Sequence, residues 1–299
     1  MKALIVGGGA REHAIARRLA EDAEVYAYMS NKNPGIAHLA RGHRIGRETD
    51  VDAVTAYAKE TGIDIGFIGP EAPLGAGLVD ALAEAGIPAV GPTTRAAELE
   101  TSKSFMRGLM QRHKIPGGVR FGVFSDVSEA AEFIDHLDGR VAVKPVGLTG
   151  GKGVRVWGDH FNSPEGALHY AKEVIDERIG GSRAVVIEEL LTGEEFTLQA
   201  FVDGRTVVPM PLVQDHKRAY EGDRGPNTGG MGSYSMPDGL LPFVPREDVE
   251  RAVEVMEGTV RAMEKEDRGF RGILYGQFME TADGPRVIEY NVRFGDPEA

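Results

Sequence analysis

The first ninety residues alternate apolar stretches with helical ones, and this alternation restricts the fold more than any other feature of the chain. Strands are expected at 2–6, 24–28, 63–69 and 87–90. Helices are expected at 11–20, about 49–59 and 77–85, the second opened by a capping box of Thr49 and Asp52. Strands separated by such helices are joined by right-handed crossovers and lie parallel. We therefore expect an α/β domain with a parallel sheet over residues 1–100.

The pattern changes after residue 100. Ser102 is the expected N-cap of a helix to about 113, and residues 119–203 hold three or four strand runs with two helices between them. A helix from about 246 to 265 then leads to two final strands at 272–279 and 286–291. Because hairpins of this kind build antiparallel sheets, we expect an α+β domain over residues 101–299.

Composition narrows the class of function. The chain of 299 residues has 41% apolar and 27% charged residues, as soluble globular proteins do. No apolar run reaches the length of a membrane span, and the apolar start is too short for a signal peptide, which predicts a cytoplasmic protein without a membrane partner. The absence of cysteine excludes disulfides and thiolate chemistry, and the net charge of −12 argues against a nucleic-acid surface.

The glycines at 7–9 follow the first strand and invite a dinucleotide-binding interpretation. That motif needs a third glycine where Glu12 stands, so the interpretation fails. A strand–turn–helix of this kind can still hold a phosphate on its amides, with Arg11 adding charge. A glycine turn without a ligand is an equally good explanation of this motif.

The loop from Lys144 to Gly153 is more specific. It is not a Walker A loop, because Val146 stands where that motif has glycine and Gly153 follows Lys152. It lies between two strands expected at 140–145 and 154–157, so its glycines would form a flap over phosphates, with the two lysines neutralising charge. The alternative is an ordinary hairpin loop with a solvated lysine.

Three further segments carry polar chemistry. Residues 188–195 could offer backbone groups to an adenine and the Glu195 carboxylate to a ribose, although acidic turns are usually only solvated. Glu289 and Asn291 lie two residues apart on one strand face, and their oxygens suit Mg²⁺. The long loop 214–237 joins a basic cluster at 214–218 to a glycine-rich run at 225–232, which suits a phosphorylated or carboxylated substrate or is a surface loop.

Together these motifs resemble the ATP-grasp ligases, and among them the glycinamide ribonucleotide synthetase family. The matching segments run in order along nearly the whole chain: 8–14, 69–74, 151–154, 214–218, 225–232 and 293–298. The resemblance implies an ATP-dependent ligation of glycine to 5-phosphoribosylamine in purine biosynthesis, through glycyl phosphate, with ATP and Mg²⁺ or Mn²⁺ as cofactors. It also implies that about 119–192 form a small lid within the ATP-grasp domain.

The resemblance assigns roles to individual residues. For ATP it implies Lys103, Lys144, Gly150, Gly151, Lys152, Gly153, Glu188, Glu189, Leu191 and Glu195. For the substrates it implies Gly9, Arg11, Glu71, Asp215, Lys217, Asn227, Thr228, Gly229, Gly230 and Arg293, with Asp215 at the glycine ammonium and Arg293 at its carboxylate. Arg293, Lys152 and Asp215 would be catalytic, and Glu289 and Asn291 would bind the metal.

The chain departs from the family pattern in two places. Gln277 stands where many ATP-grasp enzymes carry a second metal-binding carboxylate, which makes it a third candidate ligand. The family also continues past the motif at 293–298 into a C-terminal domain, which this sequence does not contain. A separate C-terminal piece would then be a partner. The competing hypotheses are another ATP-grasp carboxylate–amine ligase and an ATP-binding module without activity.

Overall fold

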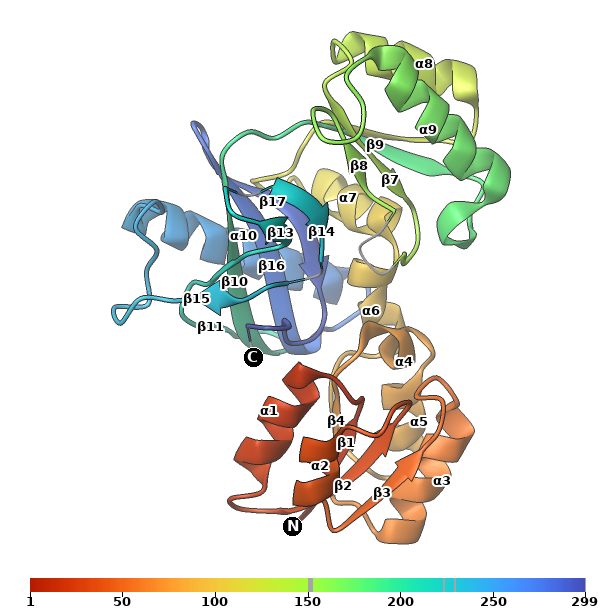
Figure 1. Ribbon diagram of the computed structural model, residues 1–299, viewed down its shortest axis with the longest axis vertical. Coiled ribbons are helices and arrows are strands. Elements are labelled where there is room, and N and C mark those ends of the chain that lie inside the picture. The colour runs from red at the N-terminus through yellow and green to blue at the C-terminus, as the bar shows by residue number, and fades with distance from the viewer. Residues whose placement is uncertain (150–152, 223, 229, 299) are drawn as a thin grey trace.

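The computed structural model describes residues 1–149, 153–222, 224–228 and 230–298, without the side chains of 226 and 227. Figure 1 shows three parts along its long axis: a sheet with its helices at the N-terminal end, a central sheet, and a smaller sheet with two helices at the opposite end. The chain passes from the first part to the third and then back to the central one.

The N-terminal sheet is parallel, as predicted, with the order β3-β2-β1-β4-β5. Its strands are β1 (Lys2–Val6), β2 (Glu24–Met29), β3 (Gly42–Ile45), β4 (Ile65–Ile68) and β5 (Ala89–Val90). Its helices are α1 (Ala10–Leu19), α2 (Pro34–Leu39), α3 (Val51–Thr61), α4 (Glu71–Gly75) and α5 (Leu78–Glu84). In β1, Ile5 packs in a cluster with α1 and α2, and Leu4 and Val6 pack with α3 and α5, so helices cover both faces.

Two details of this domain differ from the sequence predictions. The N-cap of α3 is Asp50, whose side chain accepts from Ala53 N at 3.1 Å, so the capping box at Thr49 was wrong by one residue. The helices α2 and α4 and the strand β3 were not predicted. The helix α2 is only six residues long and β3 reads Gly-His-Arg-Ile, so neither segment carries a clear apolar period.

Two helices connect the N-terminal domain to the rest. The helix α6 (Thr94–Thr101), which was not predicted, is followed at once by α7 (Lys103–Arg112). Ser102 caps α7 through its hydroxyl, which accepts from Phe105 N at 3.3 Å, as predicted. Residues 113–118 then lead into the smaller sheet.

That smaller sheet, of order β6-β9-β7-β8, is antiparallel. It comprises β6 (Phe121–Phe124), β7 (Val141–Pro145), β8 (Arg155–Val156) and β9 (Val185–Glu189), with α8 (Val127–His136), α9 (Pro164–Glu177) and a 3-10 turn at Ile179–Gly181. The side chains of these elements form a hydrophobic cluster of their own. The segment predicted as a small lid, about 119–192, contains these elements, and its role as a lid stays a prediction.

The central sheet, of order β11-β10-β16-β17, is antiparallel too, which confirms the predicted α+β class. Its strands are β10 (Glu194–Asp203), β11 (Val207–Pro209), β16 (Arg271–Thr281) and β17 (Gly284–Asn291), and α10 (Arg246–Lys265) packs on one side. The loop before α10 carries the short strands β12 (Gln214–Asp215), β13 (Arg218–Tyr220), β14 (Arg224–Asn227) and β15 (Ser233–Tyr234). No helix within the described residues could cross a membrane.

Candidate active site

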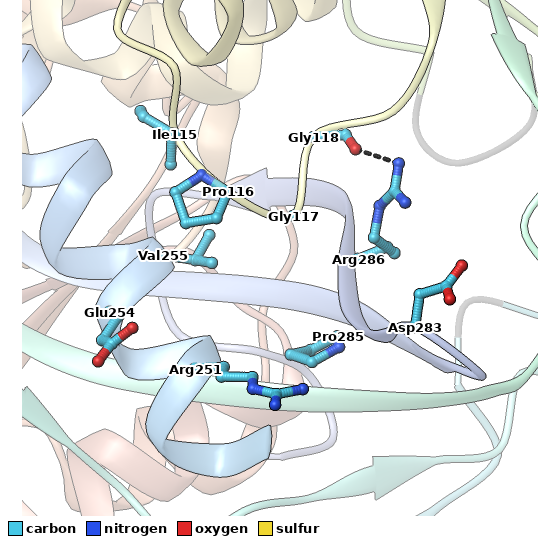
Figure 2. A pocket seen from close by; sticks show the side chains of 10 residues that line it. All are labelled: Ile115, Pro116, Gly117, Gly118, Arg251, Glu254, Val255, Asp283, Pro285 and Arg286. Carbon is cyan, nitrogen blue, oxygen red and sulfur yellow. Dashed lines mark hydrogen bonds between the residues drawn. The ribbon is translucent and has the colours of Figure 1, made fainter. Parts of the chain in front are cut away.

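Two hollows of about 430 and 460 Å³ lie beside the linker 113–118, but neither is the predicted site. Figure 2 shows the first, between Ile115–Gly118, helix α10 and the β16–β17 hairpin, where Arg286 donates to the Gly118 carbonyl. None of the residues that the sequence assigns to ATP, metal or substrate lines either hollow. The candidate site is therefore located by its chemistry.

The central sheet has two faces of opposite character. On one, which we call the apolar face, Phe196, Leu198, Leu274, Phe278, Val287 and Tyr290 are buried in the main core with α10. On the other, which we call the polar face, two rows of paired polar side chains run across β10, β16 and β17. They are Thr197–Gln277–Glu289 and Gln199–Tyr275–Asn291. A buried sheet face made of polar side chains is unusual and marks a binding surface.

A β-bulge in β17 keeps these two faces distinct. Phe278 pairs with Val287, but the next residue, Gln277, pairs with Glu289, so Ile288 is an extra residue. Without the bulge, Ile288 would stand opposite Gln277, and Glu289 would point to the apolar face. The bulge therefore directs Glu289 onto the polar face with Asn291.

Glu289 and Asn291 fit the metal that the sequence predicts. Their carboxylate and amide oxygens are hard donors, and Mg²⁺ usually binds one or two protein carboxylates together with phosphate oxygens. No group of three or more His, Cys, Asp or Glu among the described residues could hold an ion. The Asn291 Oδ1 atom also accepts from Arg293 Nη2 at 2.9 Å, and its second lone pair is available to a cation.

Three cations lie within electrostatic range of Glu289. Its charge acts to raise the pKa of Lys103, Lys217 and Arg293. For Lys103 burial prevails and, with the nearby Lys144, lowers the pKa. For Lys217 burial alone would lower the pKa, but the carboxylates of Glu195, Asp215 and Glu289 raise it above its ordinary value. Three cations around one carboxylate form a site suited to a polyphosphate.

Glu188 and Lys144 form a buried ion pair of 2.7 Å, and Arg107 grips the same carboxylate with two bonds of 2.7 Å. Burial alone would raise the pKa of Glu188, but Arg107 and Lys144 lower it to about 2. Lys144 Nζ also donates to the Ile288 carbonyl at 3.3 Å. Lys144, which was predicted for ATP, therefore contacts β17. Glu188, also predicted for ATP, has its carboxylate on protein cations in this structure.

The other residues predicted for the nucleotide lie nearby. Glu189 is paired with Arg120 and Arg286, and Leu191 lies half-buried between β9 and β10. The Glu195 Oε2 atom accepts from Gln277 Nε2 at 2.6 Å and from Lys217 Nζ at 3.1 Å. Since Gln277 uses its nitrogen there, its oxygen is the atom that could contact a cation. The ribose contact of Glu195 stays a prediction.

Some predicted residues lie outside the described ones. These are Gly150, Gly151, Lys152 and Gly229, together with the side chain of Asn227. The described end of the flap, Gly153, accepts a bond of 2.7 Å from the Tyr170 hydroxyl, and its N–H donates to Thr149. The flap is thus attached to α9 at this end.

The loop 214–232 lies against the polar face through Lys217. The Asp215 side chain is 5% exposed and lies 3.5 Å from Lys217 Nζ. The Lys217 carbonyl accepts from Thr228 N at 2.8 Å and from its hydroxyl. Gly230 has a φ of 133°, and a Cβ there would lie 2.8 Å from Pro297, so this position needs glycine. Asp215, Lys217, Thr228 and Gly230 thus belong to one assembly beside the sheet.

Arg293, just after β17, joins the polar face to the N-terminal domain. Its Nη2 atom lies 3.4 Å from Glu100 and its Nε atom 3.7 Å from Glu71. Glu100 is 7% exposed and accepts from Val292 N at 2.8 Å. Burial raises the pKa of Glu100 to about 7 although Arg293 lowers it. The predicted substrate residues Glu71 and Arg293 are therefore neighbours.

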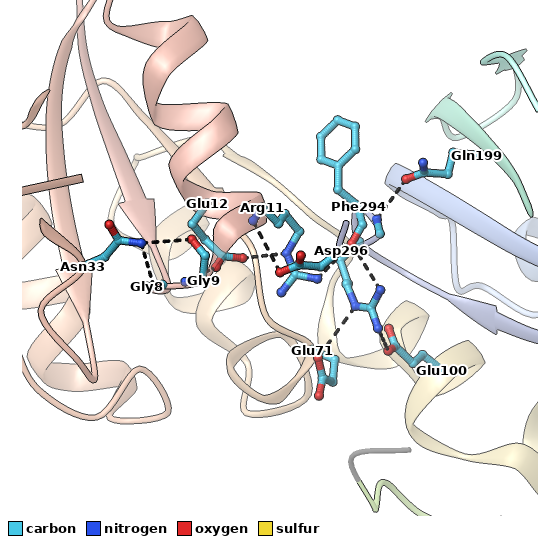
Figure 3. A network of polar contacts seen from close by, with 12 residues as sticks. Gly8, Gly9, Arg11, Glu12, Asn33, Glu71, Glu100, Gln199, Phe294 and Asp296 are labelled. Carbon is cyan, nitrogen blue, oxygen red and sulfur yellow. Dashed lines mark hydrogen bonds and ion pairs between the residues drawn. The ribbon is translucent and has the colours of Figure 1, made fainter. Parts of the chain in front are cut away.

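The glycine turn after β1 contacts the C-terminal segment (Figure 3). Glu12 accepts from Gly9 N and from Arg11 Nε, both at 2.6 Å, and occupies the space over Gly7 and Gly69. Arg11 also donates to the Phe294 carbonyl at 2.9 Å and is 9% exposed. Glu12 thus occupies the space beside the glycine turn that a dinucleotide would need, and Arg11 packs between the domains. The phosphate contacts of Gly9 and Arg11 stay predictions.

Sequence reasoning missed several residues of this site. Thr197 and Gln199 alternate with the apolar Phe196 and Leu198 in β10, a period-two signal that could have revealed the polar face. Arg107 lies on the helical stripe of buried Met106 and Met110, and a charge there signals a buried partner. Glu100 gave no comparable signal, because α6 itself was not predicted.

Comparison with known proteins gives a consistent result. Residues 1–100 match the family model of the phosphoribosylglycinamide synthetase N domain, and residues 101–299 match that of its ATP-grasp (A) domain. The phosphoribosylamine–glycine ligase of Methanothermobacter thermautotrophicus is 60% identical over 299 residues, which are the whole of this chain and 68% of that protein.

Solved structures agree in fold. The crystal structure of the Thermotoga maritima phosphoribosylamine–glycine ligase matches with a TM-score of 0.82 and 32% identity, over 100% of this chain and 70% of that one. A biotin carboxylase domain from Hydrogenobacter thermophilus, in complex with MgADP, matches with a TM-score of 0.70 and 16% identity, over 98% and 64% of the two chains. The second match is a likeness of fold alone. With both domain models matched along its whole length, this chain belongs to the phosphoribosylglycinamide synthetase family.

Proposed function

We propose that the chain catalyses the ATP-dependent joining of glycine to 5-phosphoribosylamine in purine biosynthesis, giving glycinamide ribonucleotide, ADP and phosphate. One observation carries the proposal. Glu289 and Asn291 share one face of the central sheet, and the charge of Glu289 acts on Lys103, Lys217 and Arg293. A carboxylate, an amide and several cations on one surface suit a metal-bound triphosphate. The names of the relatives supply the two substrates.

Each part of the reactants would be bound by residues of matching charge or hydrogen-bonding chemistry. Lys103 and Lys144, with Lys152 on the flap, would bind the phosphates, and the segment from Glu188 to Glu195 would bind the adenosine. Glu289 and Asn291, with Gln277 as a third candidate, would hold Mg²⁺ or Mn²⁺. When bound, the metal would neutralise negative charge on the phosphates. Asp215 would bind the glycine ammonium and Arg293 its carboxylate, while Gly9, Arg11, Glu71 and the loop 227–230 would bind the phosphoribosyl group.

Two displacements complete the reaction. A carboxylate oxygen of glycine attacks the γ-phosphorus of ATP, and the bond to ADP breaks, giving glycyl phosphate. The amine of phosphoribosylamine then attacks the glycyl carbonyl carbon, loses a proton and expels inorganic phosphate. Preorganised cations stabilise the charge that spreads over the phosphoryl oxygens in such steps.

ADP release tests the proposal directly. The purified chain is supplied with ATP and Mg²⁺, and with glycine and phosphoribosylamine singly and together. Release that requires both substrates supports the proposed ligation. Release with other acceptors would assign a different ATP-grasp ligation. ATP binding with no turnover would leave a nucleotide-binding module and contradict the proposal.

A further inference from the structure

The β-bulge at Ile288 leaves backbone groups without partners in the sheet at the centre of the candidate site. A bulge leaves its extra residue out of the ladder, so the peptide groups around it need other partners. Here the carbonyls of Val287 and Ile288 both point to Arg107, which donates to them at 2.9 and 2.8 Å from its two terminal nitrogens. One side chain therefore satisfies both carbonyls of the bulge.

Arg107 is itself held rigidly. It is only 1% exposed, and its Nε and Nη2 atoms bind the two oxygens of Glu188 at 2.7 Å each. Glu188 in turn pairs with Lys144, which donates a second bond to the Ile288 carbonyl. A planar guanidinium with five donors in a fork can make these contacts at once, whereas a lysine ammonium cannot.

We propose that Arg107 is a positioning residue for the metal site: it holds the bulge that turns Glu289 onto the polar face. It would not touch the metal or the substrates itself. The inference rests on the proposed function, because it assigns Arg107 a role only if Glu289 binds the metal. Residues that orient metal ligands from behind typically change metal affinity by about 10- to 100-fold when replaced.

A purely structural ion pair is the competing explanation. Removing Arg107 would leave Glu188 buried with one partner fewer, and this alone destabilises a protein. A fall in stability or in turnover would therefore not decide between the two roles. The decisive quantity is the affinity for the metal compared with the affinity for the nucleotide without metal.

The test uses Arg107→Lys and follows Mn²⁺ binding to the chain with ADP by electron paramagnetic resonance. We expect the dissociation constant for Mn²⁺ to rise by about 10-fold or more. ADP binding in EDTA, measured by calorimetry, should stay within about twofold of the wild type. Arg112→Lys is the matched control, since Arg112 lies on the same helix but is 52% exposed and pairs with the partly exposed Glu266. It should change neither quantity.

Two outcomes would overturn the positioning role: unchanged Mn²⁺ affinity in Arg107→Lys, or an equal loss of metal-free ADP binding and Mn²⁺ binding. Glu289→Gln separates this from failure of the proposed function. If the wild type does not bind Mn²⁺, or if Glu289→Gln binds Mn²⁺ as tightly as the wild type does, the proposed metal site is wrong and both proposals fall. Should Arg107→Lys not fold, Arg107→Gln, which can still donate to one carbonyl, takes its place with the same expectation.

Discussion

The two faces of the central sheet are built from the same strands but serve different ends. On the apolar face, Phe196 and Phe278 stack with ring centroids 5.3 Å apart, and both belong to the hydrophobic core that includes α10. On the polar face, Thr197, Gln199 and Gln277 are as deeply buried, yet they bond to other polar groups. Burial is thus similar at these positions on both faces, and the chemistry of the side chains separates them. We expect changes on the first face to alter stability and changes on the second to alter activity.

The largest effect should come from Phe278→Ala on the apolar face. Truncating a fully buried phenylalanine removes its stacking partner from Phe196 and leaves a cavity, which typically costs about 3–5 kcal/mol of stability. Chemical denaturation measures the loss. Phe278→Leu, which retains most of the volume, should lose less than about 1.5 kcal/mol. Equal losses in the two variants would mean that the apolar face is not tightly packed.

Glu289→Gln should produce the converse result on the polar face. The amide keeps the shape of the side chain but removes the charge that faces Lys103, Lys217 and Arg293. We expect kcat/KM for the proposed ligation to fall by about 100-fold, which corresponds to about 2.7 kcal/mol. The free energy of unfolding should change by less than about 1 kcal/mol.

The control for this variant is Glu250→Gln, an exposed position on α10 that lies outside the candidate site. It should match the wild type in both rate and stability. If Glu289→Gln retains wild-type turnover, the polar face is not the reacting surface. If it unfolds like Phe278→Ala, the contrast between the faces is wrong.

The sequence predicts the fold and one row of the site well, for an identifiable reason. The period-two pattern on the last strand places Glu289 and Asn291 on one face, and the structure has them there. The same pattern hides the bulge, because nothing in Val287-Ile288-Glu289 marks an extra residue. The bulge depends on Arg107, which is distant in sequence and donates to both carbonyls. Contacts of this kind arise from tertiary packing and carry no local signal.

The glycine turn after β1 also shows what local sequence patterns can and cannot predict. Glu12 excludes a dinucleotide on sequence grounds, and the structure adds that its carboxylate occupies the space over Gly9. The sequence could not predict that Arg11 would be buried against the Phe294 carbonyl, since the two lie 283 residues apart. Contacts between domains over such separations cannot be predicted from local sequence patterns.

The smallest predicted effect concerns Glu280, a charge at the edge of the apolar face. Burial raises the pKa of its carboxyl to about 7, and the neighbouring Asp248 raises it too. A raised carboxyl pKa means that the folded state favours the neutral form. Stability is therefore fully present below the unfolded pKa of about 4.5 and is lost as the pH rises through 7.

Glu280→Gln removes this ionisation. It should be more stable than the wild type at pH 8, by about 1 kcal/mol after allowance for solvent screening of a partly exposed group, and the gain should vanish near pH 4.5. Thermal unfolding between pH 4.5 and 8 measures the difference. Glu194→Gln is the matched control, because Glu194 pairs with Glu280 in the ladder but is exposed, and it should show no such trend. A Glu280→Gln variant with a pH profile parallel to the wild type would mean that this carboxylate is well solvated. The apolar face would then tolerate charge at its edge, and its contrast with the polar face would rest on its centre alone.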